Sequence, residues 1–439
     1  MTMERRYRTG DQMWVREHNL AIVLNYLWEA GRPVSRAYLV RISGLNKSTV
    51  GSLLAQLQSW GFVKESGKSE PRPGRPGTLV DVNPAAGRIV GVEIGVGFIS
   101  VVVTDFKAQV IWRQKVETES QYPLSQTQIL EQAEQLIQTA IDATPCEHHL
   151  FGIGVTVPAL IDHSTGMVLF APNLKWSEVS FRDKWQQRFG VPVIVENDAN
   201  AAALGEQMIG VAKQVDNFVY LSAGVGLGGG LIIGGKLYGG VGGFAGEVGH
   251  MTLEPDGPLC NCGNRGCWET FVGPVAIVRC VRQAVAQGRA PNLLAMAEVN
   301  GNVDAIRLEH VLLAAAQGEP AVLDVLNDVG CYLGIGIANL INTFNPSLVV
   351  LGGVLSLAGP YILPRAQEEV NVRTLSVVRR GVKITLSAFK FDAAVMGGVT
   401  LILRKILGNP TARRPKATPQ VWPSEHDHIY DFFQRERDL

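Results

Sequence analysis

Three cysteines and one histidine form the most informative cluster of chemically active residues in this 439-residue sequence. Cys260, Cys262 and Cys267 follow a C-x-C-x4-C spacing, and His250 precedes them. Intervening glycines let the backbone fold back on itself, so the four side chains can supply the tetrahedral ligands that Zn²⁺ prefers. The alternative is three reduced cysteines in a glycine-rich turn, but cysteines this close together in polar sequence rarely fill a core. We therefore predict a structural zinc site.

Two carboxylates flank this cluster, Glu247 on the histidine side and Glu269 on the cysteine side. A closed site with four protein ligands has no open position for catalysis, so we expect the metal to hold these carboxylates in place as a pocket wall. His250 has two interpretations. One ring nitrogen binds zinc while the other donates to a ligand, or the ring is a metal ligand only.

These residues carry a family resemblance. The run G-E-x-G-H followed by C-x-C-G-x-x-G-C-x-E resembles the zinc signature of the ROK family, which contains bacterial sugar kinases and sugar-responsive repressors. The segment 196–201, E-N-D-A-N-A, resembles the family run whose aspartate is the general base toward the sugar hydroxyl in the kinases. The segment 172–176, P-N-L-K-W, resembles the one whose asparagine contacts sugar. The likeness extends over residues 15–407.

The resemblance implies a set of sugar-binding side chains that offers hydrogen-bond donors and acceptors without a cation. The set is Asn173, Asn197, Asp198, Glu247, His250 and Glu269. Such a lining suits a neutral monosaccharide better than a phosphate. For any one member, a structural role such as helix capping or loop bracing is the alternative.

Both glycine loops that would cradle ATP phosphates depart from the kinase pattern. The first has Glu93 and Gly97 where ROK kinases carry the Asp and Thr of an Asp-x-Gly-Gly-Thr pattern, and the second has Val225 where they carry Thr. Each lost hydroxyl removes a hydrogen bond to a charged group, worth ~1.5–3 kcal/mol. We expect no catalytic residue to be in use, although Asp198 matches the kinase base and leaves residual activity open.

The N-terminal segment predicts a winged helix-turn-helix. Apolar spacing indicates a helix over residues 15–28, Ser35 is a suitable N-cap for a short second helix that ends at Gly44, and Asn46 for a third that ends at Gly61. Residues 62–65 and 78–82 then predict two strands around a loop rich in Gly, Pro and Arg, which is a wing. The segment also resembles the heads of ROK repressors, which the family's kinases lack.

If the third helix is the recognition helix, polar residues at its start and on its outward side should face the major groove, and wing arginines should face phosphates or a minor groove. The predicted DNA contacts are Asn46, Lys47, Ser48, Thr49, Ser52, Gln56, Arg72 and Arg75. The alternative is a helical protein-interaction module with a flexible linker.

The charge distribution favours DNA. Residues 1–80 hold twelve Lys and Arg against six Asp and Glu, whereas the whole chain has a net charge of zero, so the remainder carries −6. No basic-then-apolar leader and no apolar run of ~18 residues is found, so we expect a cytoplasmic protein without a membrane span. The six cysteines do not suggest a disulfide framework.

From residue 83 the pattern changes to strands at 89–93, 98–104 and 110–116, a helix at 129–141 and a strand at 151–157, and a similar order recurs from residue 218. The duplication predicts an α/β body with the two-lobed actin, sugar kinase and Hsp70-like fold that the resemblance implies. The expected domains are the winged helix-turn-helix (1–82), a first lobe (83–197 plus 386–407), a second lobe with the zinc site (198–385) and a C-terminal tail (408–439).

Three functions follow from these patterns. The leading hypothesis is a transcriptional repressor of carbohydrate genes, binding operator DNA as a dimer or tetramer and responding to a monosaccharide. The second is an ATP-dependent ROK sugar kinase that carries a DNA-binding head. The third is a zinc-stabilised scaffold that binds a transport or signalling protein.

Overall fold

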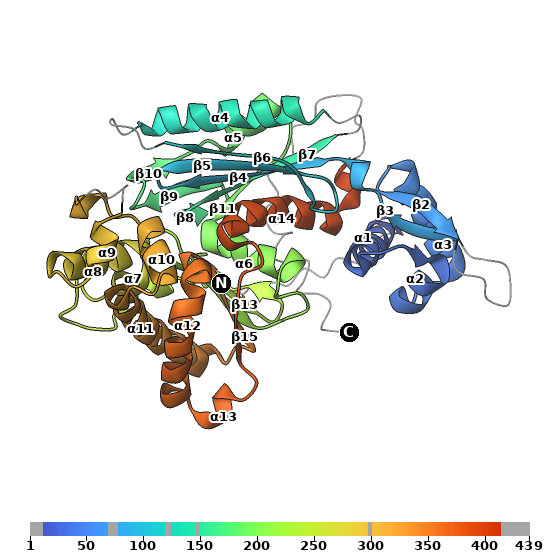
Figure 1. Ribbon diagram of the computed structural model, residues 1–439. Helices are drawn as coiled ribbons and strands as arrows, with labels where there is room; N and C mark the ends of the chain where they lie inside the picture. Colours follow the sequence, from blue (N-terminus) through green and yellow to red (C-terminus); the bar gives the residue numbers. More distant parts are fainter. Residues whose placement is uncertain (1–11, 69–77, 119–123, 146–148, 297–300, 414–439) are drawn as a thin grey trace, which may run out of the picture.

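A small head and a two-lobed α/β body make up the protein (Figure 1). The structure is a computed structural model that describes residues 12–68, 78–118, 124–145, 149–296 and 301–413. The fold class is the predicted one, an N-terminal helix-turn-helix followed by the actin-like sugar kinase fold.

The head forms from strong local signals. Its helices are α1 (Gln12–Ala30), α2 (Arg36–Ser43) and α3 (Lys47–Ser59), and its three-stranded sheet has the order β1 (Val34–Ser35), β3 (Thr78–Val82), β2 (Val63–Lys68). The Ser35 hydroxyl accepts from the Tyr38 N–H at 3.2 Å, and the Asn46 side chain accepts from the Thr49 N–H at 2.8 Å. Both predicted caps are therefore present, and they fix where α2 and α3 begin.

Lobe I is built on a five-stranded mixed sheet. Its order is β11 (Val193–Asn197), β7 (Leu150–Val157), β4 (Arg88–Gly95), β5 (Phe98–Thr104), β6 (Val110–Glu117), with β4, β7 and β11 parallel. Helices α4 (Gln126–Ala143) and α5 (Arg182–Phe189) cover its outer face (Figure 1). A second sheet of β8 (Leu160–Asp162), β9 (Met167–Ala171) and β10 (Trp176–Val179) was not anticipated from the sequence.

Lobe II repeats this plan. Its sheet has the order β14 (Lys236–Leu237), β13 (Leu227–Ile233), β12 (Phe218–Ala223), β15 (Leu348–Gly353), β16 (Lys383–Leu386), and β12, β15 and β16 are parallel. The helices of this lobe are α7 (Glu269–Val272), α8 (Pro274–Ala286), α9 (Pro291–Leu294), α10 (Leu308–Ala316), α11 (Pro320–Phe344), α12 (Val354–Arg373) and α13 (Ser376–Arg379). By length and composition α11 could cross a membrane, but 61% of its most apolar window is buried inside the protein, as in a core helix.

Two helices lie between the sheets, α6 (Asp198–Ile209) and α14 (Ala393–Gly408) (Figure 1). They approach so closely that a Cβ at Gly397 of α14 would lie 2.3 Å from the carbonyl carbon of Ala201 of α6. A Cβ at Gly154 of β7 would likewise lie 1.8 Å from the Gly398 oxygen. Only glycine permits this spacing, so α14 is held against both α6 and the lobe I sheet.

The head shares its hydrophobic core with lobe I. One cluster of buried side chains runs from Leu20 and Leu24 of α1, through Phe62, to Phe106 and Leu403. Because this core is continuous, the head is fixed to lobe I rather than tethered to it.

Polar contacts close the edge of this junction. The Trp28 indole N–H donates to the Phe106 oxygen at 3.0 Å, the Asn25 amide donates to the Leu407 oxygen at 3.0 Å, and Lys107 pairs with Asp81 at 2.7 Å. After α14 the chain stays on the protein, since the short helix η5 (Pro410–Arg413) lies against α1. The rest of the predicted tail lies outside the described residues.

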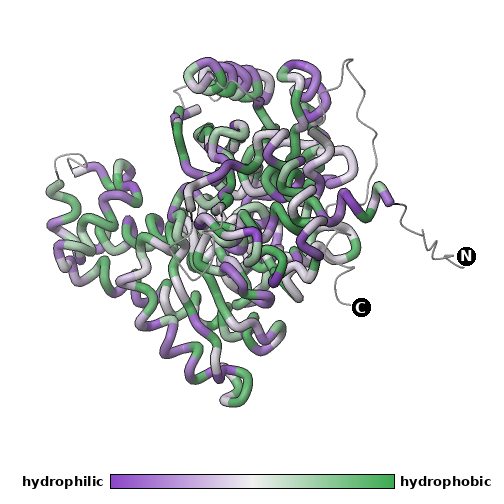
Figure 2. Tube along the Cα trace, turned by 90° about the vertical axis from the view of Figure 1, so that its right-hand side faces the viewer, coloured by the Kyte–Doolittle hydropathy of each residue, from purple (hydrophilic) through white to green (hydrophobic). Residues whose placement is uncertain are grey.

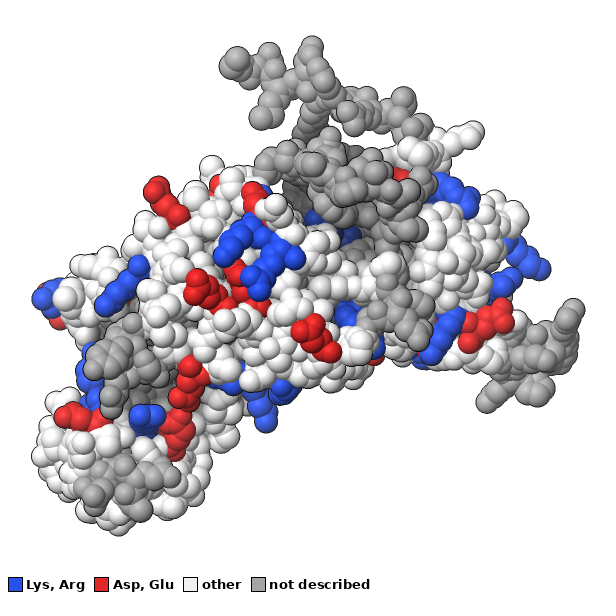
Figure 3. Space-filling model, turned by 90° about the horizontal axis from the view of Figure 1, so that it is seen from above, with Lys and Arg blue, Asp and Glu red and all other residues white. Residues whose placement is uncertain are grey.

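Surface properties follow from this arrangement. Hydrophilic and hydrophobic residues alternate along the outer helices, as amphipathic helices require (Figure 2). On the face above α4 and α5, basic and acidic side chains are interspersed, and several basic side chains surround the head (Figure 3).

Candidate functional site

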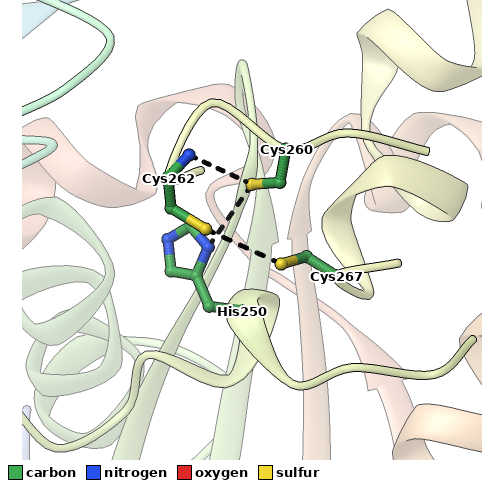
Figure 4. A group of neighbouring side chains, drawn as sticks. All are labelled: His250, Cys260, Cys262 and Cys267. Atoms are coloured by element: carbon green, nitrogen blue, oxygen red, sulfur yellow. Dashed lines mark hydrogen bonds between the residues drawn. The ribbon is translucent and has the colours of Figure 1, made fainter. Parts of the chain in front are cut away.

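The four predicted metal ligands converge on one point in lobe II (Figure 4). Their ligating atoms lie within 4.8 Å of one another. Cys260 Sγ is 3.7 Å from His250 Nδ1, and Cys262 Sγ is 3.7 Å from Cys267 Sγ. A tetrahedron with metal–ligand bonds of about 2.0–2.3 Å has edges of about 3.3–3.8 Å, and the two separations of 3.7 Å lie in this range. The cluster could therefore hold a metal ion.

Tight turns bring the ligands together. The short helix η2 (Val248–His250) presents His250, and the cysteine loop folds back through isolated bridges between Thr252 and Cys267 and between Leu259 and Arg265. Gly266 has φ +65°, and a Cβ there would lie 1.5 Å from the Glu254 oxygen. The glycine is therefore required for the loop that holds the ligands.

Glu269 joins this cluster to the second glycine loop. One of its oxygens lies 2.7 Å from Cys260 Sγ, and the other accepts from the Leu227 N–H at 3.3 Å. The cysteine loop also reaches lobe I, because the Asn261 amide donates to Asn173 Oδ1 at 3.3 Å. The predicted metal ligands are thus linked by direct contacts to Glu269 and, through the cysteine loop, to Asn173, two residues of the predicted sugar-binding set.

Asn197 and Asp198 lie at the N-terminus of α6. The Asn197 side chain accepts from the backbone N–H groups of Ala199 and Asn200 at 2.9 and 3.0 Å and donates to the Ala159 oxygen at 3.1 Å. It therefore has the capping role that the sequence left open as its alternative.

The carboxyl group of Asp198 has a raised pKa. Burial raises its pKa to about 6, the backbone N–H of Ala199 opposes this change, and the nearby Glu247 adds to it. Above that pH the carboxylate can accept a hydrogen bond from a ligand hydroxyl.

A recess opens beside these residues. It encloses about 260 Å³, including space open to solvent, and its interior has room for about one water molecule. Asn197 and Glu247 of the predicted set line it, and so do His163, Glu196 and Phe244, which were not predicted as site residues. No local pattern marks His163 or Phe244, whereas Glu196 belongs to the E-N-D-A-N-A run.

The first glycine loop is covered by an aromatic ring. A Cβ at Gly95 would lie 2.3 Å from the Phe98 ring, and Lys115 Nζ lies 3.8 Å from the centre of that ring. Burial raises the pKa of Glu93 to about 8, and Asp198 adds to this change. A carboxyl that keeps its proton at neutral pH is a poor ligand for the Mg²⁺ of a nucleotide.

The predicted DNA-facing residues of α3 lie on one accessible side of the head. Asn46, Lys47, Ser48 and Ser52 are exposed, and Thr49 and Gln56 are half-buried. The predicted Arg72 and Arg75 lie outside the described residues.

Arg16 of α1 joins this side and was not predicted. Its guanidinium donates to Ser52 Oγ at 3.1 Å and to Gln56 Oε1 at 2.6 and 3.0 Å. Only the tertiary contact between α1 and α3 places it there, so the sequence holds no local signal for it.

Comparisons with known proteins agree with this architecture. The model of the ROK family matches residues 89–405, and that of the IclR helix-turn-helix domain matches residues 20–67. A putative xylose repressor from Caldicellulosiruptor sp. (strain Rt8B.4) is 34% identical over 402 residues, which are 91% of this chain and 99% of that protein.

Two further similar proteins are a sugar kinase and a transcriptional regulator. A glucokinase from Streptomyces coelicolor is 37% identical over 63% of this chain and 85% of its own. The crystal structure of a ROK family transcriptional regulator, described as a homolog of the E. coli MLC protein, has a TM-score of 0.74 and 28% identity. It covers 90% of this chain and 97% of its own. The similarity to regulators therefore includes the head.

Proposed function

The chain belongs to the ROK family, and we propose that it is a sugar-responsive transcriptional repressor that binds operator DNA. The observation that carries this proposal is the helix-turn-helix head, which presents an accessible polar helix, α3, and is fused through one core to a ROK body. The similarity to a putative xylose repressor extends over 91% of this chain, so it includes residues of both the head and the body.

The side chains at the start of α3 suit the major groove. Asn46, Ser48 and Ser52 can donate to and accept from base edges, and Lys47 can neutralise a phosphate. Arg16 fixes Ser52 and Gln56 from α1 and adds a second positive charge to the same side. Symmetric operators are read by dimers, so we expect a homodimer or a pair of dimers that places two heads on one DNA.

The effector in this proposal is a neutral monosaccharide. The proposed contacts are Asn173, Asp198, Glu247, His250 and Glu269. Glu247 lines the recess, and Asn173 and Glu269 both contact the cysteine loop. Among the residues that the structure describes, no Lys or Arg lines this recess. Carboxylates accept hydrogen bonds from hydroxyls but repel a phosphate, so we expect the free sugar to bind and its phosphate ester to be rejected.

We assign the metal to Zn²⁺, held by His250, Cys260, Cys262 and Cys267. Three thiolates and an imidazole are a donor set of structural zinc, and with these four protein ligands the metal would have no open position. Bound there, the metal would supply no chemistry beyond fixing the cysteine loop. Through that loop Glu269 and Asn261 are held at the cleft.

The route from sugar to DNA runs through the two central helices. Asp198 and the capping Asn197 begin α6, the glycine contacts bind α6 to α14, and the end of α14 bonds to α1 of the head. Closure of the lobes on a sugar would move α6 and α14 together, because their backbones are in direct contact at Gly397 and Ala201. The sugar can change DNA affinity only by its differential affinity for the two arrangements, typically ~1–3 kcal/mol.

Selection of random duplex DNA by the purified full-length chain, followed by titration of the selected sequence with and without a panel of monosaccharides, tests the proposal. We expect one DNA sequence to be enriched, and we expect one sugar to change the Kd of the protein for that DNA by about tenfold or more. No enrichment, or a Kd that no sugar alters, would contradict it. A cytoplasmic location follows from this function.

Sugar phosphorylation is the second candidate, favoured by the glucokinase relative and by Asp198, whose pKa of about 6 suits a general base. The covered first glycine loop and Glu93 oppose it. A coupled assay for sugar-dependent ADP release separates the two, since a repressor without kinase activity gives no signal above background.

A further inference from the structure

His163 occupies a junction between the two lobes. It follows β8 in lobe I, and its Nδ1 lies 3.3 Å from Glu196 Oε2. The opposite edge of its ring lies on the backbone of Gly243 in lobe II, where a Cβ would come 2.8 Å from Cδ2 and 3.1 Å from Nε2. Gly243 also has φ +84°, so a side chain at this position would be strained both by the backbone angle and by contact with the His163 ring.

Glu196 connects His163 to the start of α6. This side chain is only 5% exposed, and its Oε1 accepts from the Asn197 N–H at 2.9 Å and from the Asn200 amide at 3.3 Å. A buried carboxylate needs a donor for each oxygen, and His163 faces the oxygen that Asn197 and Asn200 do not use. The imidazole therefore holds the carboxylate that braces the first turn of α6, next to Asp198.

The second partner, Gly243, belongs to a glycine-rich segment that leads directly into Glu247. Gly240, Gly243 and Gly246 all have left-handed backbone angles, and the Ala245 N–H donates to the Gly239 oxygen at 3.0 Å. Glycines leave such a segment with high conformational freedom, so a ring packed on Gly243 restricts where Glu247 lies.

We propose that His163 is a positioning residue of the effector site: through Glu196 it orients the turn that carries Asp198, and through Gly243 it orients the segment that carries Glu247. The ring thus limits the positions of two carboxylates, Asp198 at the start of α6 and Glu247 after the glycine-rich segment. This inference rests on the proposed function for the identity of the ligand, whereas its geometric part stands without it.

Two variants separate the hydrogen bond from the volume of the ring. His163→Leu keeps an apolar side chain of similar size against Gly243 but has no donor for Glu196. His163→Asn places an amide N–H close to the position of Nδ1 and restores the donor. Ser164→Ala, an exposed position in the same turn, is the matched control.

The experiment uses the full-length chain with its metal. Calorimetric titration with the monosaccharide that stabilises the wild type most should show a Kd about tenfold or more weaker for His163→Leu. We expect His163→Asn to regain most of this loss and Ser164→Ala to match the wild type. Hydrogen exchange of residues 239–247 is measured in parallel without sugar and should be faster in His163→Leu.

The two readouts distinguish the possible failures. Wild-type sugar affinity in His163→Leu, or equal weakening in the leucine and asparagine variants, would overturn the proposal. If the wild type bound no monosaccharide, the proposed function would fail, and unchanged exchange of residues 239–247 in His163→Leu would then refute the positioning role independently.

Discussion

Replacement of Glu93 by glutamine should stabilise the folded protein at neutral pH. The carboxyl lies at the end of β4, where burial raises its pKa from 4.5 to about 8. At pH 7 the carboxyl is therefore about nine-tenths protonated in the folded state and ionised in the unfolded chain. Because the two pKa values differ, the free energy of unfolding of the wild type is lowered by up to about 3 kcal/mol at pH 7 and about 5 kcal/mol at pH 9.

The sign follows from linkage. Because the folded-state pKa is raised, the contribution of this carboxyl to stability is fully present below pH 4.5 and is lost as the pH rises toward 8. Glutamine does not titrate, so Glu93→Gln should equal the wild type below pH 4.5 and exceed it increasingly up to pH 8.

Urea denaturation between pH 4.5 and 9, followed by tryptophan fluorescence, measures the difference. Trp112, Trp176 and Trp185 of lobe I report on the domain that contains Glu93. Glu117→Gln at the exposed end of β6 is the control and should change the free energy of unfolding by less than about 0.5 kcal/mol. If Glu93→Gln were no more stable than the wild type at pH 8, Lys115 or water would be stabilising the ionised form and the reasoning would be wrong.

Four further outcomes are expected. Cys262→Ser should lose the bound metal, measured by elemental analysis, and weaken sugar binding while operator affinity without sugar stays the same. Lys47→Ala should weaken operator binding and reduce its salt slope by about one. Asp198→Asn should abolish the sugar response without unfolding, and wild-type sugar affinity should fall below pH 6. Gly397→Val, whose Cβ would lie 2.3 Å from the Ala201 backbone, should lower stability by about 1–3 kcal/mol in thermal melts.

Local sequence signals determined much of the fold. The caps Ser35 and Asn46 satisfy backbone donors within their own turn, so they could be identified without knowledge of the tertiary structure. The metal cluster was predictable for the same reason, because the three cysteines lie on one tight loop and only His250 had to come from a neighbouring turn.

Long-range contacts set the limit of prediction. The strands β8 to β10 are three to five residues long, too short for a clear period of two. Arg16 reaches α3 only because two helices cross, and His163 meets Gly243 only because two lobes face each other. Asn197 was predicted from its motif, and its capping bonds to Ala199 and Asn200 are local, whereas the contact of its amide with the Ala159 oxygen depends on the tertiary structure.

The aromatic junction between head and body bears on the engineering of new regulators. Phe62 comes from the head, whereas Phe106 and Phe151 come from the body, and their ring centres lie 5.3 to 5.8 Å apart. A chimera that joins this DNA-binding head to an unrelated ligand-binding domain at residue 82 would expose the apolar side chains of Phe62 and α1, which pack against lobe I in this protein. A chimera should therefore include Phe106, Phe151 and the last two turns of α14 together with the head.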